Sequence, residues 1–298
     1  MHNPKRIYKN SVETYEIDNM GHMNVQFYVQ HAINACELFL RNENLIQSDQ
    51  CFNSIFKLEK LFIRYLREQT LGVPFSISVN FLSVDMSGIV IFLEMKNLLI
   101  NDISAAFVFS FSFHELKQKK KITVSTIKGK LSSSPLKVPL YGKKKGLSGL
   151  APLDLSYSQI KKLPKLLEPY YGIVTSKGFS IAEELSAADY MGIISKAVPH
   201  LLLQGDHSIA DTNIGGAALE YEFRFKKFVS SGCGVFMKSG LRQINAKTYT
   251  WTHWLIEAAT TEVLAVADSV IITMDLRTRK AIQMPKRMWE ELNKILVV

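Results

Sequence analysis

The first strong pattern in the chain is an apolar stripe that begins just after a short polar stretch. Between residues 25 and 40, apolar side chains recur every three or four positions, as on one face of a helix. These residues are Phe27, Tyr28, Ala32, Ile33, Ala35, Cys36, Phe39 and Leu40. Asn24 stands immediately before the stripe, and its side-chain oxygen can accept from backbone N–H groups of a first turn. The spacing predicts a helix from Val25 to Leu40 that follows a loop.

The pattern then changes to a period of two, which is typical of half-buried strands. Phe75, Ile77, Val79 and Phe81 alternate with serines and an asparagine after a Gly72-Val73-Pro74 turn. Further strand candidates are 58–66, 89–99 and 104–113, with a polar turn at Asn101-Asp102 before the last of them. One helix followed by a run of antiparallel strands predicts an α+β fold.

The chain contains two copies of this pattern, separated by a connector. Residues 130–172 hold serines, prolines, glycines and lysines, with one short helix expected near 158–167. After the connector, Asp189-Tyr190-Met191-Gly192 echoes Asp18-Asn19-Met20-Gly21 at an offset of 171, and 232–239 echoes 72–79 at an offset of 160. Late strands are expected at 248–256 and 264–274. The sequence therefore predicts an N-terminal unit (1–130), a basic linker (131–172) and a C-terminal unit (173–298).

The second copy differs from the first in chemistry. At the offset of 171, Ile193 and Ser195 stand where the first copy has His22 and Asn24, and Pro199 interrupts the following segment. We attribute the difference between the two offsets to a shorter helix-to-strand connection in the second copy. The sequence thus predicts one active copy, and a structural or vestigial role for Asp189.

The net charge narrows the choice of partners. The 298 residues include 36 Lys and Arg against 27 Asp and Glu, a formal charge of +9, with basic runs at 117–121, 143–145 and, more weakly, 161–165. Such runs are either a solvated basic face or a surface that attracts CoA phosphates or an acidic carrier protein. Nucleic acid ranks last, because no basic stripe is interleaved with aromatic residues.

Several classes of protein are disfavoured. Three scattered cysteines indicate a reducing compartment, and no stretch has the apolar character of a membrane span or a secretion signal, so we expect a cytoplasmic protein. No Gly-x-Ser-x-Gly, His-Glu-x-x-His, dinucleotide or phosphate-loop motif occurs, so the sequence predicts neither a cofactor nor a metal.

The polar stretch before the first helix resembles a known active-site loop. Asp18-Asn19-Met20-Gly21-His22-Met23-Asn24, followed by Phe27-Tyr28, is similar to the loop of hotdog-fold acyl-CoA thioesterases of the 4-hydroxybenzoyl-CoA thioesterase type. Residues 64–68 with Gly72 resemble the first sheet strands of that family, and 275–285 the end of its last strand. The resemblance covers both halves. It implies a double-hotdog protein of the thioesterase-like superfamily, in which each unit is a long helix wrapped by an antiparallel sheet and the two form an intramolecular pseudo-dimer that associates into homo-oligomers.

The resemblance also implies a chemistry for the loop. Asp18 would act as nucleophile or as general base on water, and His22 and Asn24 would orient the thioester or the water. Gly21 would let the backbone approach the acyl carbonyl, with N–H groups from Gly21 to Met23 as oxyanion donors at the helix N-terminus. Glu68 is a secondary candidate.

Each residue also has a plainer interpretation. Asp18 would serve equally as a loop residue, His22 as a structural histidine, and Asn24 as a helix cap. A Cys36–His31 pair fails, because residues five apart lie on different helix faces.

The resulting hypothesis is hydrolysis of acyl-CoA thioesters to free acid and CoA, within lipid metabolism. The alternatives are an acyl-carrier-protein thioesterase and a non-catalytic module that binds acyl-CoA or a lipid. A hydratase on the same fold is disfavoured, because the loop lacks the Asn-Pro-x-His character of that relative.

Overall fold

The computed structural model describes residues 5–47, 52, 55–113, 124–125, 127–129, 137–175, 184–203 and 213–297. Its contacts divide the chain into two compact units, Met1–Lys143 and Lys144–Val298, with the division inside the expected linker 131–172. Among the described residues, no helix is both long and apolar enough to cross a lipid bilayer. The basic run 117–121 lies outside the described residues.

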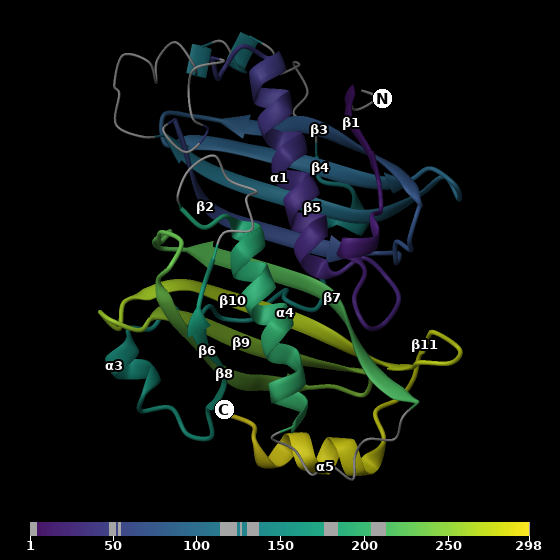
Figure 1. Ribbon diagram of the computed structural model, residues 1–298, viewed down its shortest axis with the longest axis vertical. Coiled ribbons are helices and arrows are strands. Elements are labelled where there is room, and N and C mark those ends of the chain that lie inside the picture. Colours follow the sequence, from purple (N-terminus) through teal and green to yellow (C-terminus); the bar gives the residue numbers. More distant parts are fainter. Residues whose placement is uncertain are drawn as a thin grey trace. The chain divides into compact units, whose positions relative to one another are not determined.

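The first unit is one helix packed on an antiparallel sheet (Figure 1). Its elements are β1 (Lys5–Ser11), η1 (Thr14–Glu16), α1 (Val25–Asn42), β2 (Phe56–Tyr65), β3 (Pro74–Val84), β4 (Gly88–Asn97), β5 (Asp102–Phe113) and η3 (Leu140–Gly142). The strands pair in the order β1-β3-β4-β5-β2. The predicted helix and strands are confirmed within a few residues, whereas the sequence reading missed β1.

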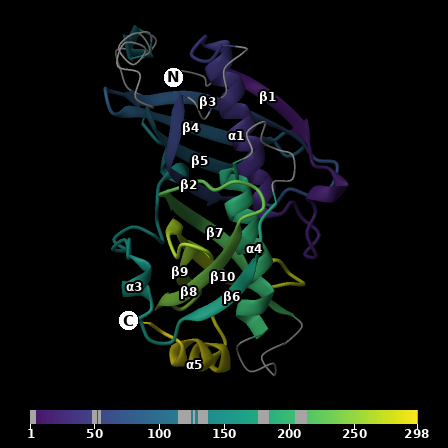
Figure 2. The same ribbon diagram turned by 60° about the vertical axis from the view of Figure 1, so that its left-hand side comes forward.

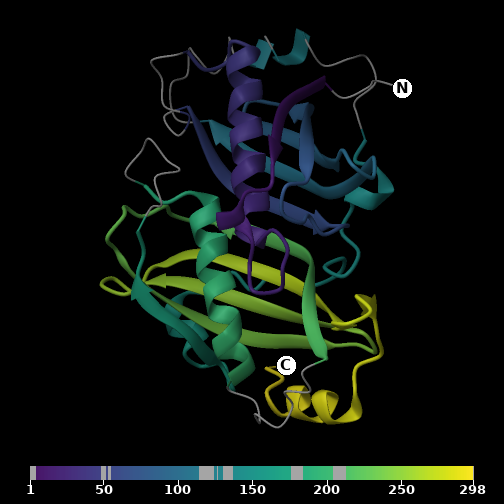
Figure 3. The same ribbon diagram turned by 45° about the vertical axis from the view of Figure 1, so that its right-hand side comes forward.

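Helix α1 crosses the sheet and buries the stripe that predicted it (Figure 3). Asn24 is the N-cap, and its side-chain oxygen accepts the N–H of Gln26 at 3.0 Å. At the far end, Phe39 packs on Phe81 of β3 with ring centroids 4.8 Å apart. The cap therefore fixes where the helix starts, and the apolar face fixes how it lies on the sheet.

The second unit repeats this architecture. Its elements are α3 (Tyr157–Ile160), β6 (Leu167–Ile173), α4 (Ala187–Leu203), β7 (Ile214–Phe225), β8 (Gly234–Ile244), β9 (Thr248–Glu257), β10 (Val263–Asp275), β11 (Lys280–Ala281) and α5 (Lys286–Lys294). The strands pair in the order β6-β8-β9-β10-β7, with β11 beside β10. Figure 2 shows α3 and α4 on opposite faces of this sheet. The short helix expected in the linker is α3, and the first strand of the second sheet, β6, also begins inside that linker.

Equivalent hydrogen bonds give the true spacing of the repeat. The Val12 N–H donates to Val73 O in the first unit as the Val174 N–H donates to Cys233 O in the second. The Tyr28 hydroxyl donates to Arg67 O as that of Tyr190 donates to Lys227 O. Residues 12 and 28 thus match 174 and 190, an offset of 162, while 73 and 67 match 233 and 227, an offset of 160.

The spacing of 160 is therefore confirmed for the strands, and the spacing of 171 for the helix start is wrong. The register shifts of the strands repeat too, for example between Phe81 and Ser83 and between Leu241 and Gln243. The connection from helix to strand is shorter in the second unit, as expected, but by two residues rather than 11.

This spacing changes which residues correspond. Asp189 lies in the first turn of α4, which runs unbroken through Pro199 to Leu203. At the offset of 162, the counterpart of Asn24 is Ser186 and that of His22 is Glu184. Ile193 and Ser195 are therefore not the counterparts of His22 and Asn24.

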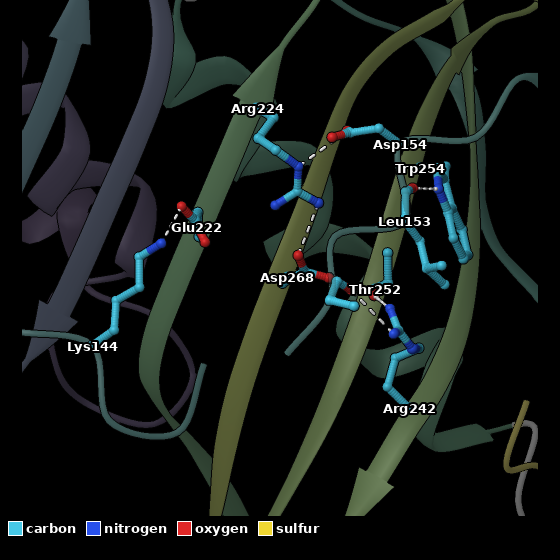
Figure 4. A network of polar contacts seen from close by, with 10 residues as sticks. Lys144, Leu153, Asp154, Glu222, Arg224, Arg242, Thr252, Trp254 and Asp268 are labelled. Carbon is cyan, nitrogen blue, oxygen red and sulfur yellow. Dashed lines mark hydrogen bonds and ion pairs between the residues drawn. The ribbon is translucent and has the colours of Figure 1, made fainter. Parts of the chain in front are cut away.

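A polar cluster ties the segment before β6 to the outer face of the second sheet (Figure 4). Arg224 donates through Nε to Asp154 at 3.0 Å and contacts Asp268 through Nη2 at 2.8 Å. Lys144 pairs with Glu222. Part of the basic run 143–145 is therefore neutralised within the protein.

Candidate functional site

The stretch predicted to be functional forms a tight loop at the N-terminus of α1. Ile17 and Met23 pair as an isolated antiparallel bridge, and the Asp18 N–H donates to His22 O at 3.0 Å. The Gly21 N–H donates to Asp18 O at 3.0 Å. Gly21 has a φ of +82°, and a Cβ there would meet no heavy atom within 4 Å. The loop therefore needs glycine for its backbone angle rather than for space.

Three ionisable side chains meet at this loop. Asp18 Oδ1 accepts the Met20 N–H at 2.8 Å, while Oδ2 lies 3.6 Å from His22 Nδ1. On the other side of the imidazole, His22 Nε2 lies 3.7 Å from Glu68 Oε1. Both gaps are too long for a direct hydrogen bond and are close enough for electrostatic attraction.

The exposure of these groups suits chemistry with a solvent-borne reactant. The side chains of Asp18 and His22 are each 20% exposed, and that of Glu68 is 39% exposed. The structure thus brings Asp18, Gly21 and His22 together as predicted, and it adds Glu68, which lies 46 residues further along the chain than His22.

Of the backbone donors expected from Gly21 to Met23, the described residues leave only the His22 N–H open. The Gly21 N–H is used by Asp18 O, and the Met23 N–H donates to Gln69 O at 2.7 Å. The N–H groups of His22 and Val25 have no hydrogen-bond partner within the described part of the chain. Because they lie at the positive end of the helix dipole, these two N–H groups are placed to attract a negatively charged group.

Asn24 has the role of a cap in this geometry. Its side-chain oxygen binds the Gln26 N–H, and its own N–H donates to Glu16 O at 2.8 Å. The contacts explain Asn24 structurally, and its predicted part in orienting substrate stays a prediction.

The loop is anchored to the sheet through a buried residue that the sequence did not single out. Gln69 is fully buried, and its carbonyl holds Met23 while its N–H donates to the Tyr28 hydroxyl at 2.9 Å. Its side-chain amide donates to Ser104 Oγ and accepts from Asn97 Nδ2, both at 2.8 Å. The bond from the Met23 N–H to the Gln69 carbonyl has an equivalent in the second unit, where the Leu185 N–H donates to Val229 O.

The described residues of the second unit show no such constellation. Asp189 is 4% exposed, and its Oδ2 accepts the N–H and the hydroxyl of Ser186, both at 2.8 Å. Its carboxylate closes the first turn of α4, which supports the structural role predicted for it.

The other candidate groups give no second centre. Burial raises the pKa of the Cys36 thiol, and His31 faces Glu16 rather than Cys36. Within the described ranges, no three His, Cys, Asp or Glu residues are grouped as metal ligands.

A family comparison identifies the first unit. Residues 12–131 match the model of the thioesterase-like superfamily. This span contains residues 18–24, which we call the Asp18 loop, together with α1 and strands β2 to β5. The first unit is therefore similar to this superfamily. The prediction of a thioester hydrolase is thereby confirmed at the level of the superfamily. Among curated protein sequences, none matches the chain.

Solved structures extend the likeness to the whole chain. An enzyme provisionally named oleoyl thioesterase from Lactobacillus plantarum aligns with a TM-score of 0.66 and 11% identity, over 92% of this chain and 98% of its own. The 12:0-ACP thioesterase from Umbellularia californica aligns with a TM-score of 0.65 and 8% identity, over 92% and 99%. A protein described as having the hot dog fold, from Alicyclobacillus acidocaldarius, aligns with a TM-score of 0.53 and 9% identity, over 91% and 96%. The chain therefore has the fold of two tandem hotdog units.

Proposed function

We propose that the Asp18 loop hydrolyses acyl thioesters, with Asp18 as the catalytic carboxylate. The observation that carries the proposal is the line of Asp18, His22 and Glu68 in front of the N-terminus of an 18-residue helix. A carboxylate beside open backbone donors supplies both requirements of thioester hydrolysis, activation of a nucleophile and stabilisation of an oxyanion.

In the proposal, the two carboxylate oxygens of Asp18 have different roles. Oδ1 is held by the Met20 N–H, so Oδ2 is the oxygen that faces the reaction. As general base, Oδ2 takes a proton from water, and the water oxygen attacks the acyl carbon. The C–S bond then breaks, and the departing thiolate takes up the proton from Asp18 and leaves as the thiol. As nucleophile, Oδ2 attacks the acyl carbon itself, the C–S bond breaks and the thiolate leaves. Water then hydrolyses the resulting anhydride to the free acid and restores the Asp18 carboxylate.

His22 and the helix N-terminus complete the site. In the proposal, the imidazole orients the attacking water or the thioester between Asp18 and Glu68. The N–H groups of His22 and Val25 bind the developing oxyanion. Each of these groups contributes roughly 10²-fold to the rate.

The carrier of the acyl group is CoA or a carrier protein. The loop resembles acyl-CoA thioesterases, and the +9 charge suits CoA phosphates and an acidic carrier alike. The carrier-protein alternative gains weight because a similar two-unit chain is named a 12:0-ACP thioesterase. A homo-oligomer stays a prediction for either substrate.

The test is thiol release from matched acyl-CoA and acyl-carrier-protein substrates of several chain lengths. Asp18→Asn should lower kcat by about 10²-fold or more, because it removes the base or nucleophile. Asp189→Asn is the matched control, since it makes the same change in a carboxylate that only caps α4, and it should keep full kcat. Higher kcat/KM on one carrier identifies the substrate class. Full activity of Asp18→Asn would refute the assignment, and no turnover of any thioester by the intact chain would favour the binding module.

A further inference from the structure

A buried carboxylate and a buried imidazole lie next to the Asp18 loop. Glu16 and His31 are 2% and 5% exposed, and Glu16 Oε1 lies 2.8 Å from His31 Nε2. An ionised carboxylate can only accept, so Nε2 carries the proton of this hydrogen bond.

The pair continues into a directed chain of hydrogen bonds. Tyr8 of β1 bonds to His31 Nδ1 at 2.9 Å, and the Tyr8 oxygen accepts from Asn10 Nδ2 at 3.1 Å. With Nε2 protonated, a neutral imidazole accepts the Tyr8 proton at Nδ1, and each donor has an acceptor. The imidazole also packs against Phe75, with ring centroids 4.8 Å apart. Strands β1 and β3 and helix α1 thus fix the position of the Glu16 carboxylate.

Glu16 in turn holds both ends of the loop. Its backbone carbonyl accepts the Asn24 N–H at 2.8 Å, and its Oε2 accepts the Glu13 N–H at 3.1 Å. It is followed directly by Ile17, which pairs with Met23. Residues 17–23 therefore start at Glu16 and return to its backbone carbonyl, and the side chain of the same residue is held by His31.

The second unit serves as an internal comparison. At the offset of 162, the counterpart of Tyr8 is Tyr170, but that of His31 is Ile193, which is 1% exposed. An apolar residue therefore suffices at this helix position for the hotdog unit to pack. Because burying a carboxylate and an imidazole costs desolvation energy, stability alone does not account for the pair in the first unit.

We propose that Glu16 and His31 are positioning residues that hold the Asp18 loop in its reactive geometry, an inference that rests on the function proposed for that loop. They touch no reacting atom and act through the backbone of residues 17–24. A displacement of about 1 Å in a catalytic group can cost roughly 10²-fold in rate.

The kinetic test compares variants that keep the fold. Glu16→Leu/His31→Ile replaces both buried polar groups, so neither is left unpaired, and its helix residue is the one found in the second unit. We expect kcat to fall about 10- to 100-fold with KM within twofold. His31→Gln, which can still donate to Glu16, should recover part of that loss. His253→Leu, which removes a buried histidine of the second unit, is the control and should keep kcat.

A double-mutant cycle shows whether the pair acts through Asp18. In an Asp18→Asn background, the Glu16→Leu/His31→Ile change should cause little further loss, because the group that it positions is already gone. Losses that multiply would overturn the inference, as would full kcat in the folded double variant.

Amide hydrogen exchange tests the inference without relying on activity. The Met23 and Asn24 N–H groups should exchange at least about 10-fold faster in Glu16→Leu/His31→Ile than in the intact chain. In His253→Leu, the exchange rates of these two groups should equal those of the intact chain. Unchanged exchange in the double variant would refute the inference. If the intact chain hydrolyses no thioester, the proposed function fails, and the exchange result alone decides whether the pair orders the loop.

Discussion

A row of buried polar side chains inside the second unit makes its stability sensitive to acid. His253 is 2% exposed, and its ring nitrogens lie 2.9 Å from Ser239 Oγ and 3.2 Å from Ser269 Oγ. At the offset of 160, the first unit has Val79, Leu93 and Phe109 at these three positions. The row is therefore particular to the second unit, and Leu93 indicates the replacement that the architecture accepts.

Burial lowers the pKa of His253 to about 3, from 6.5. The unfolded chain binds a proton at this residue below pH 6.5, whereas the folded chain resists it down to about pH 3. Stability is therefore complete above pH 6.5 and is lost as the pH falls. At about 1.4 kcal/mol for each pH unit, protonation of His253 in the unfolded chain lowers the free energy of unfolding by about 3 kcal/mol at pH 4.5 relative to neutral pH.

The assay is urea unfolding of the intact chain and His253→Leu at pH 7.5, 5.5 and 4.5. Other groups titrate in both proteins, so the difference between the two free energies of unfolding isolates His253. That difference should move in favour of the variant by about 3 kcal/mol between pH 7.5 and 4.5. Any offset from the unpaired serines is the same at each pH. Parallel pH profiles for the two proteins would refute the reasoning.

Three further outcomes test the loop itself. Gly21→Ala should destabilise the protein by roughly 1–2 kcal/mol in urea unfolding, through its φ of +82° alone; an unchanged midpoint would contradict this. Asn24→Ser should keep the cap of α1, as Ser186 serves in α4, and should keep kcat; a loss of about 10²-fold in kcat would instead give the Asn24 carboxamide a chemical role. Glu68→Gln should lower kcat by roughly tenfold with KM unchanged, because the imidazole of His22 loses one of its two flanking charges; an unaltered kcat would remove Glu68 from the site.

The strands were predictable because alternation is a local signal. Strands β3, β4, β5, β9 and β10 are rich in buried apolar residues, and each starts or ends within a few residues of its expected place. The edge strands β1 and β6 were missed. Each pairs with one strand in its own unit, and neither shows a clean alternation of apolar and polar residues.

The two sequence echoes show which similarities carry structure. Gly72 and Gly232 both have positive φ, at +75° and +94°, so their echo reflects a shared turn before a shared strand. The Asp-x-Met-Gly echo joins a loop at Asp18 to a helical turn at Asp189, because three matching residues do not fix a backbone conformation. A repeat is best aligned on residues that the backbone geometry requires.

The candidate site was predictable only in part for a similar reason. Residues 18–24 are neighbours in sequence, and their types and order pointed to a loop before a helix. The approach of Glu68 to His22, the clamp by Gln69 and the pairing of Glu16 with His31 all join different elements. Such contacts depend on how helix and sheet pack, and a single sequence holds no local signal for them.

The two units separate what the hotdog fold requires from what the proposed chemistry requires. In both units a tyrosine hydroxyl of the helix donates to a backbone carbonyl, that of Arg67 in the first unit and that of Lys227 in the second. This hydrogen bond therefore belongs to the scaffold. The polar groups that only one unit has lie in different places. In the first unit they surround the loop, and in the second they run under α4 from Ser239 to Ser269. Since the same backbone accepts both placements, the imidazole of His31 is not needed for folding, and its position beside the loop is best explained by what the loop does.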